Sequence, residues 1–266
     1  MNLLKKTLMA CCTFTLAVTA ISPLQGIAKT YEVSNTTELS KVLQKEYTKL
    51  TPEFDVVFSG DTATFLPTVM PLAQTIVNTY DSPHALVHRY GVSSSSTANK
   101  ATLTFNTTYF TTAAKQKKAD AKIKSVVATI KKKNKSKPAR IKAVNDYIVK
   151  NTKYSTSKST KYSAYGVLYD KQAVCQGYAY TAYLMLKALD YNVKYVTGTG
   201  RGVAHAWVMV KIGKNWYHLD TTFNDPVPDR KNVSSYSYYL VSDKNLSKTH
   251  VWDTTKYPKA SKNYNR

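Results

Sequence analysis

The chain has 266 residues and carries 38 Lys and Arg against 16 Asp and Glu, a net charge of +22. This length suffices for one large domain or two small ones. The positive charge favours anionic polymers or membrane surfaces as partners, and no recognition motif supports nucleic acid, which we do not expect to bind.

The first 28 residues are predicted to be a signal peptide and not part of the fold. Lys5 and Lys6 precede a largely apolar run over 8–21, and the small residues Gly26 and Ala28 provide a cleavage site. The apolar run is too short to span a membrane well. We therefore expect a secreted, extracellular protein that is either free or associated with the cell surface.

Removal of the signal peptide would leave a single cysteine. Cys11 and Cys12 lie within residues 1–28, so Cys175 alone remains. A secreted protein with one cysteine has no intramolecular disulfide, and its thiol is free or paired between molecules. The alternative interpretation is a buried structural cysteine.

Residues 29–110 are predicted to form a small mixed α/β N-terminal region with a net charge of −1. Pro67 and Pro71 predict an irregular start to the second helix, and the serines at 93–96 predict a flexible connection. His84 and His88 are four residues apart and are interpreted as surface or packing histidines, because metal binding needs more ligands. The predicted elements are helices over 35–50 and 64–80 and strands over 54–59, 85–92 and 101–109.

Residues 111–266 carry a net charge of +21 and begin with a long basic helix over 111–135. Ile123, Val127 and Ile130 give this helix a narrow apolar stripe, and lysines fill its other faces. These lysines form either a solvated helix face or a surface that docks on cell-wall or membrane anions. A second helix is predicted over 139–151, directly after Pro138.

A buried amphipathic helix is predicted over 173–189, with Cys175 in its first turn. The positive end of the helix dipole favours a thiolate there, and the free N–H groups could hold an oxyanion. Gly177 permits close approach by a substrate or by another backbone segment. A strand over 192–197 is followed by a glycine-rich stretch, 198–202, which is interpreted as a flexible turn.

The next two strands, 204–210 and 215–219, are predicted to form a hairpin around Gly213 and Lys214. In the register centred on that turn, Trp207 faces Asp220. His205 and Asp220 are then diagonal neighbours on one face, within reach of a hydrogen bond. A slip of one residue would place them on opposite faces.

Three blocks of this stretch resemble the transglutaminase-like superfamily: AVCQGYA at 173–179, VAHAW at 203–207 and WYHLDTTFNDP at 216–226. The resemblance implies an α+β, papain-like core in which a nucleophile helix packs on an antiparallel sheet. It extends over about 139–243, within a transglutaminase-like domain at 111–266 with core motifs at 173–226. By this resemblance Cys175 is the nucleophile, His205 the general base and Asp220 the group that orients the imidazole.

The same residue types suit attack of a thiolate on a carboxamide carbonyl to give a thioester. An amine would then complete a crosslink, and water would complete hydrolysis. We expect a secreted acyltransferase, cysteine protease or amidase that acts on protein or peptide substrates, with neither cofactor nor metal. The alternative is a catalytically inactive module of the same fold that binds anionic cell-wall polymers.

Some features are left open by the sequence. The oxyanion-stabilising side chain that the family places upstream of the cysteine is not identified, although Tyr165, Tyr169 and Gln172 are candidates. No acidic cluster suggests calcium sites. His218 shares the face of Asp220 but lacks the motif context, so it is left out of the predicted site. The acyl acceptor and the oligomeric state are also not determined.

Overall fold

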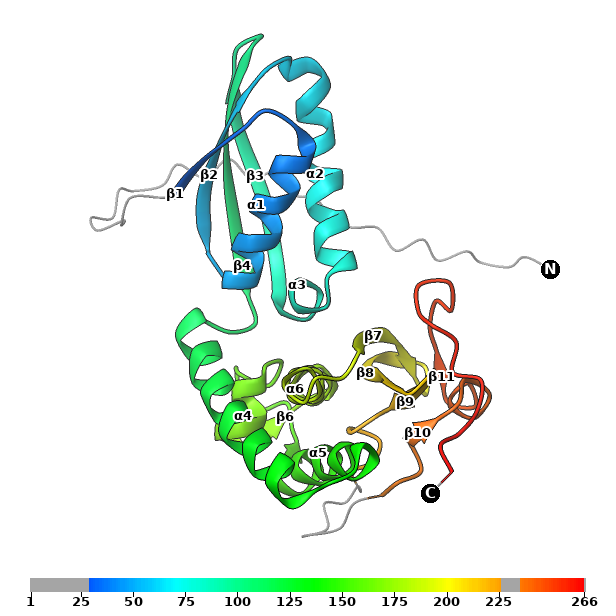
Figure 1. Ribbon diagram of the computed structural model, residues 1–266. Helices are drawn as coiled ribbons and strands as arrows, with labels where there is room; N and C mark the ends of the chain where they lie inside the picture. Colours follow the sequence, from blue (N-terminus) through cyan, green and yellow to red (C-terminus); the bar gives the residue numbers. More distant parts are fainter. Residues whose placement is uncertain (1–28, 226–234, 266) are drawn as a thin grey trace, which may run out of the picture.

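The computed structural model describes residues 29–225 and 235–265; the predicted signal peptide at 1–28 lies outside them. Two large sheets and one two-stranded sheet organise the described residues (Figure 1). The first half forms a four-stranded sheet in the order β1-β2-β4-β3. Its elements are β1 (Lys29–Val33), α1 (Thr36–Lys49), β2 (Glu53–Ser59), α2 (Thr62–Thr79), α3 (Asp81–Leu86), β3 (Val87–Ser96) and β4 (Lys100–Tyr109).

Alternation along β2 and β4 explains why α1 and α2 cover one face of this sheet (Figure 1). Phe54, Val56 and Phe58 of β2 are buried, and the residues between them are partly exposed. Phe54 stacks on Phe105 of β4 with ring centroids 5.1 Å apart, and Tyr47 of α1 packs edge-on against Phe54. The mixed α/β character predicted for this region is confirmed.

Two local predictions for this region were wrong. Pro67 and Pro71 lie inside a continuous α2. Because they are four residues apart and exposed, both fall on the solvent face, where water can satisfy the carbonyls that lose their helical partners. Residues 93–96 belong to β3 and pair with β4. The two histidines of this region lie in different elements: His84 is partly buried in α3, and His88 is exposed in β3.

The second half contains a five-stranded antiparallel sheet in the order β10-β9-β8-β7-β11. Strands β5 and β6 form a separate parallel pair. The elements are α4 (Ala113–Lys133), α5 (Lys137–Asn151), β5 (Lys153–Tyr154), the π-helix η1 (Gly166–Asp170), β6 (Gln172–Ala173), α6 (Cys175–Ala188), β7 (Val193–Gly200), β8 (Val203–Ile212), β9 (Asn215–Leu219), β10 (Tyr239–Val241), α7 (Asp243–Leu246) and β11 (His250–Val251).

Helix α6 lies between this sheet and the pair α4 and α5, where Figure 1 shows it end-on. A helix that is apolar nearly all round is stable only when it is buried. Tyr178, Ala182 and Met185 are accordingly buried at successive turns. By contrast, α4 buries only a stripe through Ile123 and Ile130, as predicted. The predicted α+β arrangement, in which a helix that begins at Cys175 packs on an antiparallel sheet, is confirmed.

The predicted hairpin register is also confirmed. Ile212 pairs with Asn215 and Val208 with Leu219, which centres the turn on Gly213 and Lys214. The preceding glycine-rich stretch was predicted wrongly as a turn, because β7 continues to Gly200. The turn between β7 and β8 is therefore reduced to Arg201 and Gly202.

Helix α3 contacts α6 and β7 of the second half. The Gln176 side-chain amide donates to the Ala85 carbonyl at 2.6 Å. The Tyr195 backbone N–H donates to the Asp81 carboxylate at 2.9 Å. Residues of the N-terminal half thus hold the first turn of α6. The division of the chain into two domains at residue 110 stays a prediction.

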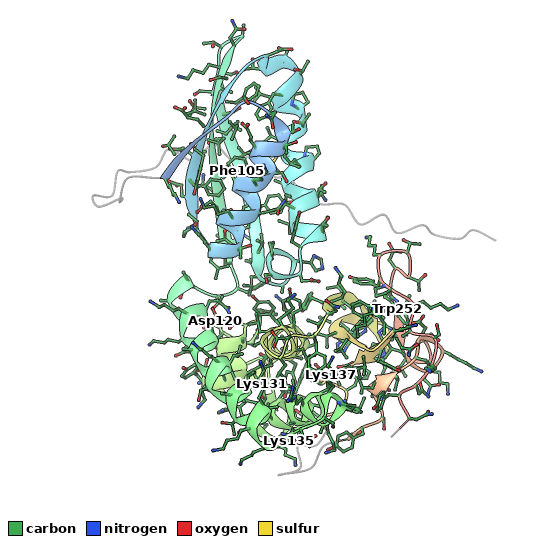
Figure 2. The ribbon with its side chains drawn as sticks, viewed as in Figure 1. Phe105, Asp120, Lys131, Lys135, Lys137 and Trp252 are labelled. Atoms are coloured by element: carbon green, nitrogen blue, oxygen red, sulfur yellow. The ribbon has the colours of Figure 1, made fainter. Side chains whose placement is uncertain are left out.

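Lysines cover the outer surface of α4 and α5. Lys131, Lys135 and Lys137, labelled in Figure 2, are all exposed. Within the ranges that the structure describes, no helix combines the length and the apolar character needed to cross a lipid bilayer.

Candidate active site

The imidazole of His205 is bonded to a fully buried carboxylate. Its Nε2–H donates to Asp220 Oδ2 at 2.7 Å, across the hairpin whose register places both on one face. His205 is also largely buried, with 8% of its surface exposed. His205 and Asp220, which belong to two different sequence motifs, are therefore in direct contact.

Asp220 accepts hydrogen bonds at both of its carboxylate oxygens. The backbone N–H groups of Thr222 and Phe223 donate to Oδ1 at 2.9 and 3.0 Å. His250 Nε2–H donates to Oδ2 at 3.0 Å, beside the bond from His205. Burial alone would raise the pKa of this carboxyl, but the bonds from the two histidines outweigh burial and lower it. The carboxylate is therefore held charged and fixed.

Cys175 is the first residue of α6 and is half-buried with a free thiol. Close packing at the start of this helix depends on Gly177, since an added Cβ would lie 2.5 Å from the Lys161 carbonyl oxygen. Another backbone segment, and not a substrate, thus occupies the space that this glycine leaves. Cys175 hydrogen-bonds to the His205 imidazole, whose Nε2 is already engaged by Asp220, so Nδ1 is the atom left for the thiol.

These contacts make His205 unusually basic. Burial opposes protonation of the imidazole, but the hydrogen bonds and charges of Asp220 and Cys175 outweigh it and raise its pKa to about 9. The imidazolium form of His205 therefore places a proton donor beside the Cys175 sulfur.

His250 was missed by the sequence interpretation. It lies in β11, which pairs with β7 at Gly200. Its Nδ1 is 2.8 Å from the Thr249 hydroxyl, and since Nε2–H donates to Asp220, that hydroxyl is the donor. No periodicity or motif marks a two-residue strand, so only the tertiary pairing brings His250 to the site.

Tyr154 was also missed. Its hydroxyl accepts a hydrogen bond from the Cys175 backbone N–H, the first free donor of α6. Burial and the nearby sulfur charge raise the pKa of this phenol, which keeps its O–H available as a donor. Tyr154 could not be singled out from the sequence as a site residue, because four tyrosines lie between residues 150 and 170.

Two tyrosines and one glutamine were the candidates from sequence for the oxyanion-stabilising side chain. All three make their contacts away from the cavity at His205. Tyr165 and Tyr169 stack on each other with centroids 4.7 Å apart, and the Tyr169 hydroxyl donates to the Lys118 carbonyl. The Gln172 side chain accepts from the Ser155 hydroxyl. None of the three lines the cavity at His205.

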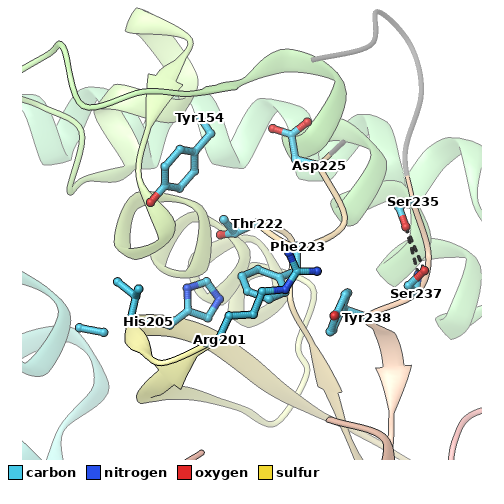
Figure 3. Close-up of a pocket in the computed structure, with 12 residues that line it drawn as sticks. Tyr154, Arg201, His205, Thr222, Phe223, Asp225, Ser235, Ser237 and Tyr238 are labelled. Atoms are coloured by element: carbon cyan, nitrogen blue, oxygen red, sulfur yellow. Dashed lines mark hydrogen bonds between the residues drawn. The ribbon is translucent and has the colours of Figure 1, made fainter. Parts of the chain in front are cut away.

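A cavity of about 690 Å³ opens beside His205 (Figure 3). Figure 3 shows Tyr154 and Asp225 on one side of it and Arg201 on the other. Its walls combine aromatic rings with hydroxyl groups, a mixture suited to a peptide-like ligand. The lining residues are Tyr154, Gly200, Arg201, Val203, Ala204, His205, Thr222, Phe223, Asp225, Ser235, Ser237 and Tyr238.

His218 contacts the site indirectly, through Trp207. The indole Nε1–H of Trp207 donates to His218 Nδ1 at 3.0 Å, and His218 Nε2–H donates to Asp243 at 2.8 Å. Trp207 in turn lies against His205 with ring centroids 5.9 Å apart. His218 thus fixes a neighbouring ring and makes no contact of its own with Asp220 that would add it to the predicted site.

Among the described residues, one group of three could hold a metal ion: His205, Asp220 and His250, whose ligand atoms lie within 4.8 Å of one another. The two histidine Nε2 atoms lie 2.7 and 3.0 Å from the same carboxylate oxygen. Those are hydrogen-bond separations and leave no space for an ion between the three. The geometry fits a proton-bearing network better than a metal site.

Residues 124–221 match the family model of the Transglutaminase-like superfamily. The matched region contains Cys175, His205 and Asp220, so the resemblance predicted from the three sequence blocks is confirmed for this part of the chain.

Similar solved structures share little sequence with the chain. One described as "Crystal structure of a TGase" has 17% identity and a TM-score of 0.42; the match covers 80% of this chain and 62% of that one. A "Putative Cysteine Protease from Cytophaga hutchinsonii" has 15% identity and a TM-score of 0.38, with 66% and 74% covered. A "Putative Protease from Parabacteroides distasonis" has 10% identity and a TM-score of 0.30, with 63% and 40% covered. No curated protein sequence matches the chain.

Proposed function

We propose that this chain is a secreted thiol acyltransferase or hydrolase in which Cys175 is the nucleophile, His205 the general acid and base, and Asp220 the orienting group. Secretion rests on the predicted signal peptide. The observation that carries the catalytic proposal is the position of the His205 imidazole, bonded to a buried carboxylate through Nε2 and to the Cys175 thiol.

In the first step the Cys175 thiolate attacks the carbonyl carbon of a glutamine-type carboxamide or of a peptide bond. A sulfur–carbon bond forms and the carbonyl oxygen becomes an oxyanion. The His205 imidazolium then transfers its Nδ1 proton to the leaving nitrogen. The carbon–nitrogen bond breaks, ammonia or an amine departs, and a thioester remains on Cys175.

In the second step the neutral His205 removes a proton from an amine or from water as that molecule attacks the thioester. The carbon–sulfur bond breaks and the thiolate is regenerated beside the imidazolium. An amine yields a crosslinked or amine-modified product, and water yields a carboxylic acid. Asp220 acts in both steps by keeping Nε2 protonated, so that Nδ1 carries the proton in transit.

Tyr154 is the group best placed to stabilise the oxyanion. Its hydroxyl oxygen accepts from the Cys175 N–H, which leaves the hydroxyl proton free to donate to a substrate oxygen. The phenol lines the cavity and is 45% exposed, so a substrate can reach it. Preorganised donors of this kind stabilise charge that develops in the transition state.

The proposal is tested by incubating the purified chain with a glutamine-rich protein and a fluorescent primary amine. Amine incorporation, ammonia release and peptide cleavage are followed in the same samples for wild type and Cys175→Ala. Incorporation that depends on Cys175 supports a transferase, and cleavage or ammonia release without incorporation supports a hydrolase. Equal turnover in Cys175→Ala, with both proteins folded by circular dichroism, would contradict the proposal.

A second candidate function is attachment to an anionic cell-wall polymer, and the surface of α4 and α5 favours it. Residues 113–151 contain thirteen Lys and Arg against two Asp. The lysine runs on α4 are exposed, and its last turn ends with Lys131, Lys132 and Lys133. A concentrated cationic face of this kind attracts polyanions at low salt.

Sedimentation with isolated cell walls tests this attachment. Binding should weaken as salt rises, because the ions screen exposed charges. Changing the three lysines at 131–133 to Gln should weaken binding more than the same change at Lys41, Lys45 and Lys49, three exposed lysines of α1. Binding that is indifferent to salt, or equal in the two triple variants, would refute attachment through this face.

A further inference from the structure

Arg201 is held in a constrained turn at the rim of the cavity. Arg201 and Gly202 connect β7 to β8 with φ values of 50° and 83°. The left-handed region suits glycine but is unfavourable for arginine, so the surrounding structure must hold this conformation. The Arg201 backbone N–H donates to the Thr249 carbonyl at 2.7 Å, next to His250.

The guanidinium group of Arg201 lies close to the catalytic imidazole. It sits over the ring of Phe223, 5.2 Å from the centroid, and Phe223 is 4.7 Å from the His205 ring. Figure 3 shows the Arg201 side chain crossing Phe223 at the edge of the cavity. One aromatic ring therefore separates a permanent positive charge from the imidazole that contacts Cys175.

This charge has no acidic partner in the described part of the chain. Arg201 takes part in none of the ion pairs there, and among the described residues it is the one Arg or Lys that lines the cavity. Asp225 also lines the cavity, but it lies apart from Arg201, and its Oδ2 accepts the Tyr178 hydroxyl at 2.6 Å. An exposed guanidinium over an aromatic face, with no acidic partner among the described residues, presents its N–H donors to a ligand.

We infer that Arg201 forms a carboxylate-binding subsite, so that the preferred acyl donor bears a carboxylate near the carbonyl attacked by Cys175. This inference rests on the proposed function and adds the substrate class. A guanidinium binds a carboxylate through two parallel N–H···O bonds, which fixes orientation as well as charge. The carboxylate belongs either to an acidic side chain or to a free peptide C-terminus.

The inference is tested without knowledge of the substrate by comparing alkylation of Cys175 by iodoacetate and iodoacetamide. In both reactions the thiolate sulfur bonds to the CH₂ carbon as the carbon–iodine bond breaks and iodide leaves. The two reagents differ only in a carboxylate against a carboxamide. The ratio of their rates therefore measures the preference of the site for a carboxylate.

Arg201→Gln and Arg201→Gly remove the charge, and glycine also suits the positive φ, so the second variant keeps the turn. Lys214→Gln is the matched control, because Lys214 is an exposed cation in the turn at the opposite end of β8. The iodoacetate to iodoacetamide ratio should fall roughly three- to tenfold in both Arg201 variants and stay unchanged in Lys214→Gln.

A ratio that does not move in folded Arg201→Gly overturns the inference, and so does an equal fall in Lys214→Gln. A Cys175 that is inert to both reagents in wild type contradicts the proposed function instead, so the two failures are distinguishable. Protection of Cys175 by N-acetyl-glutamate amide and by N-acetyl-alanine, each against N-acetyl-alanine amide, then separates a side-chain from a terminal carboxylate. If neither acid protects better than the neutral amide, the inference fails.

Discussion

Replacing Asp220 with Asn tests whether the buried carboxylate sets the protonation of His205. The amide oxygen of Asn can still accept from the backbone N–H groups of Thr222 and Phe223. Its NH₂ group must then face the Nε2 atoms of His205 and His250, which both donate to Asp220 in the wild type. The substitution therefore removes one charge and replaces an acceptor by a donor while keeping the shape of the side chain.

The expected change follows from the pKa of His205, which is raised from 6.5 to about 9. At about 1.4 kcal/mol per pKa unit, this shift corresponds to roughly 3 kcal/mol in favour of the imidazolium. Asp220 and Cys175 share that effect against burial, so loss of the carboxylate should lower the pKa of His205 by at least about one unit. Because the folded pKa lies above 6.5, the protonated histidine stabilises the fold fully below pH 6.5, and this stabilisation is lost as pH rises through about 9.

The assay is an NMR titration of the imidazole nitrogens, which is tractable because the chain has five histidines. His205 is assigned from its absence in His205→Gln. Asp243→Asn is the matched control, since it removes the carboxylate bonded to His218 in the same sheet. In Asp220→Asn the His205 titration should move to lower pH, and in Asp243→Asn it should not. A His205 that still titrates near pH 9 without the Asp220 carboxylate would refute this reasoning.

Three further predictions concern Tyr154, His250 and Gly198. Tyr154→Phe should lower kcat roughly 10- to 1000-fold in steady-state assays, because one oxyanion donor is lost. His250→Leu should raise the pKa of the Asp220 carboxyl and cost about 1.5–3 kcal/mol in chemical denaturation, because a charged group loses a buried donor; His250→Gln, which keeps a donor, should recover most of that loss. In Gly198→Ala the new Cβ would lie 2.2 Å from the Val251 carbonyl oxygen, so the free energy of unfolding should fall by about 1–3 kcal/mol or more. Gly91→Ala, which meets nothing within 4 Å, should change it by less than about 0.5 kcal/mol. An unchanged kcat in Tyr154→Phe would contradict the first prediction. His250→Gln as unstable as His250→Leu would contradict the second, and equal losses of stability in Gly198→Ala and Gly91→Ala would contradict the third.

The parts of the site that sequence could predict are those fixed by local chemistry. A two-residue turn at Gly213 and Lys214 allows one register for the following pairs, so contact between His205 and Asp220 could be inferred from the residues of the hairpin alone. The position of Cys175 at a helix start follows from the apolar pattern after it. The roles of these three residues in catalysis remain predictions.

The missed parts depend on contacts between segments distant in sequence. His250 is 30 residues from Asp220 and reaches it because β11 pairs with β7. Tyr154 reaches the Cys175 N–H from a two-residue strand inside a polar loop. Neither strand is long enough to carry a periodic pattern, so propensity alone could not place them.

The glycines of β7 show how composition can mislead. Gly198 and Gly200 resemble a flexible turn in sequence, yet both lie in a strand. A Cβ at Gly200 would lie 3.1 Å from the His205 ring and 3.0 Å from Phe223. Glycine at position 200 therefore leaves room for the His205 imidazole and the Phe223 ring, and does not provide flexibility.

The proposed thioester on Cys175 is tested most directly by rapid quenching of the protein with a glutaminyl peptide, followed by mass spectrometry of the Cys175-containing fragment. We expect this fragment to gain the mass of the peptide's acyl group, hydroxylamine to remove the added mass, and Cys175→Ala never to acquire it. Turnover of the same peptide with no acyl group on Cys175 at any time, or undiminished turnover by Cys175→Ala, would show that the reaction does not pass through this thiol.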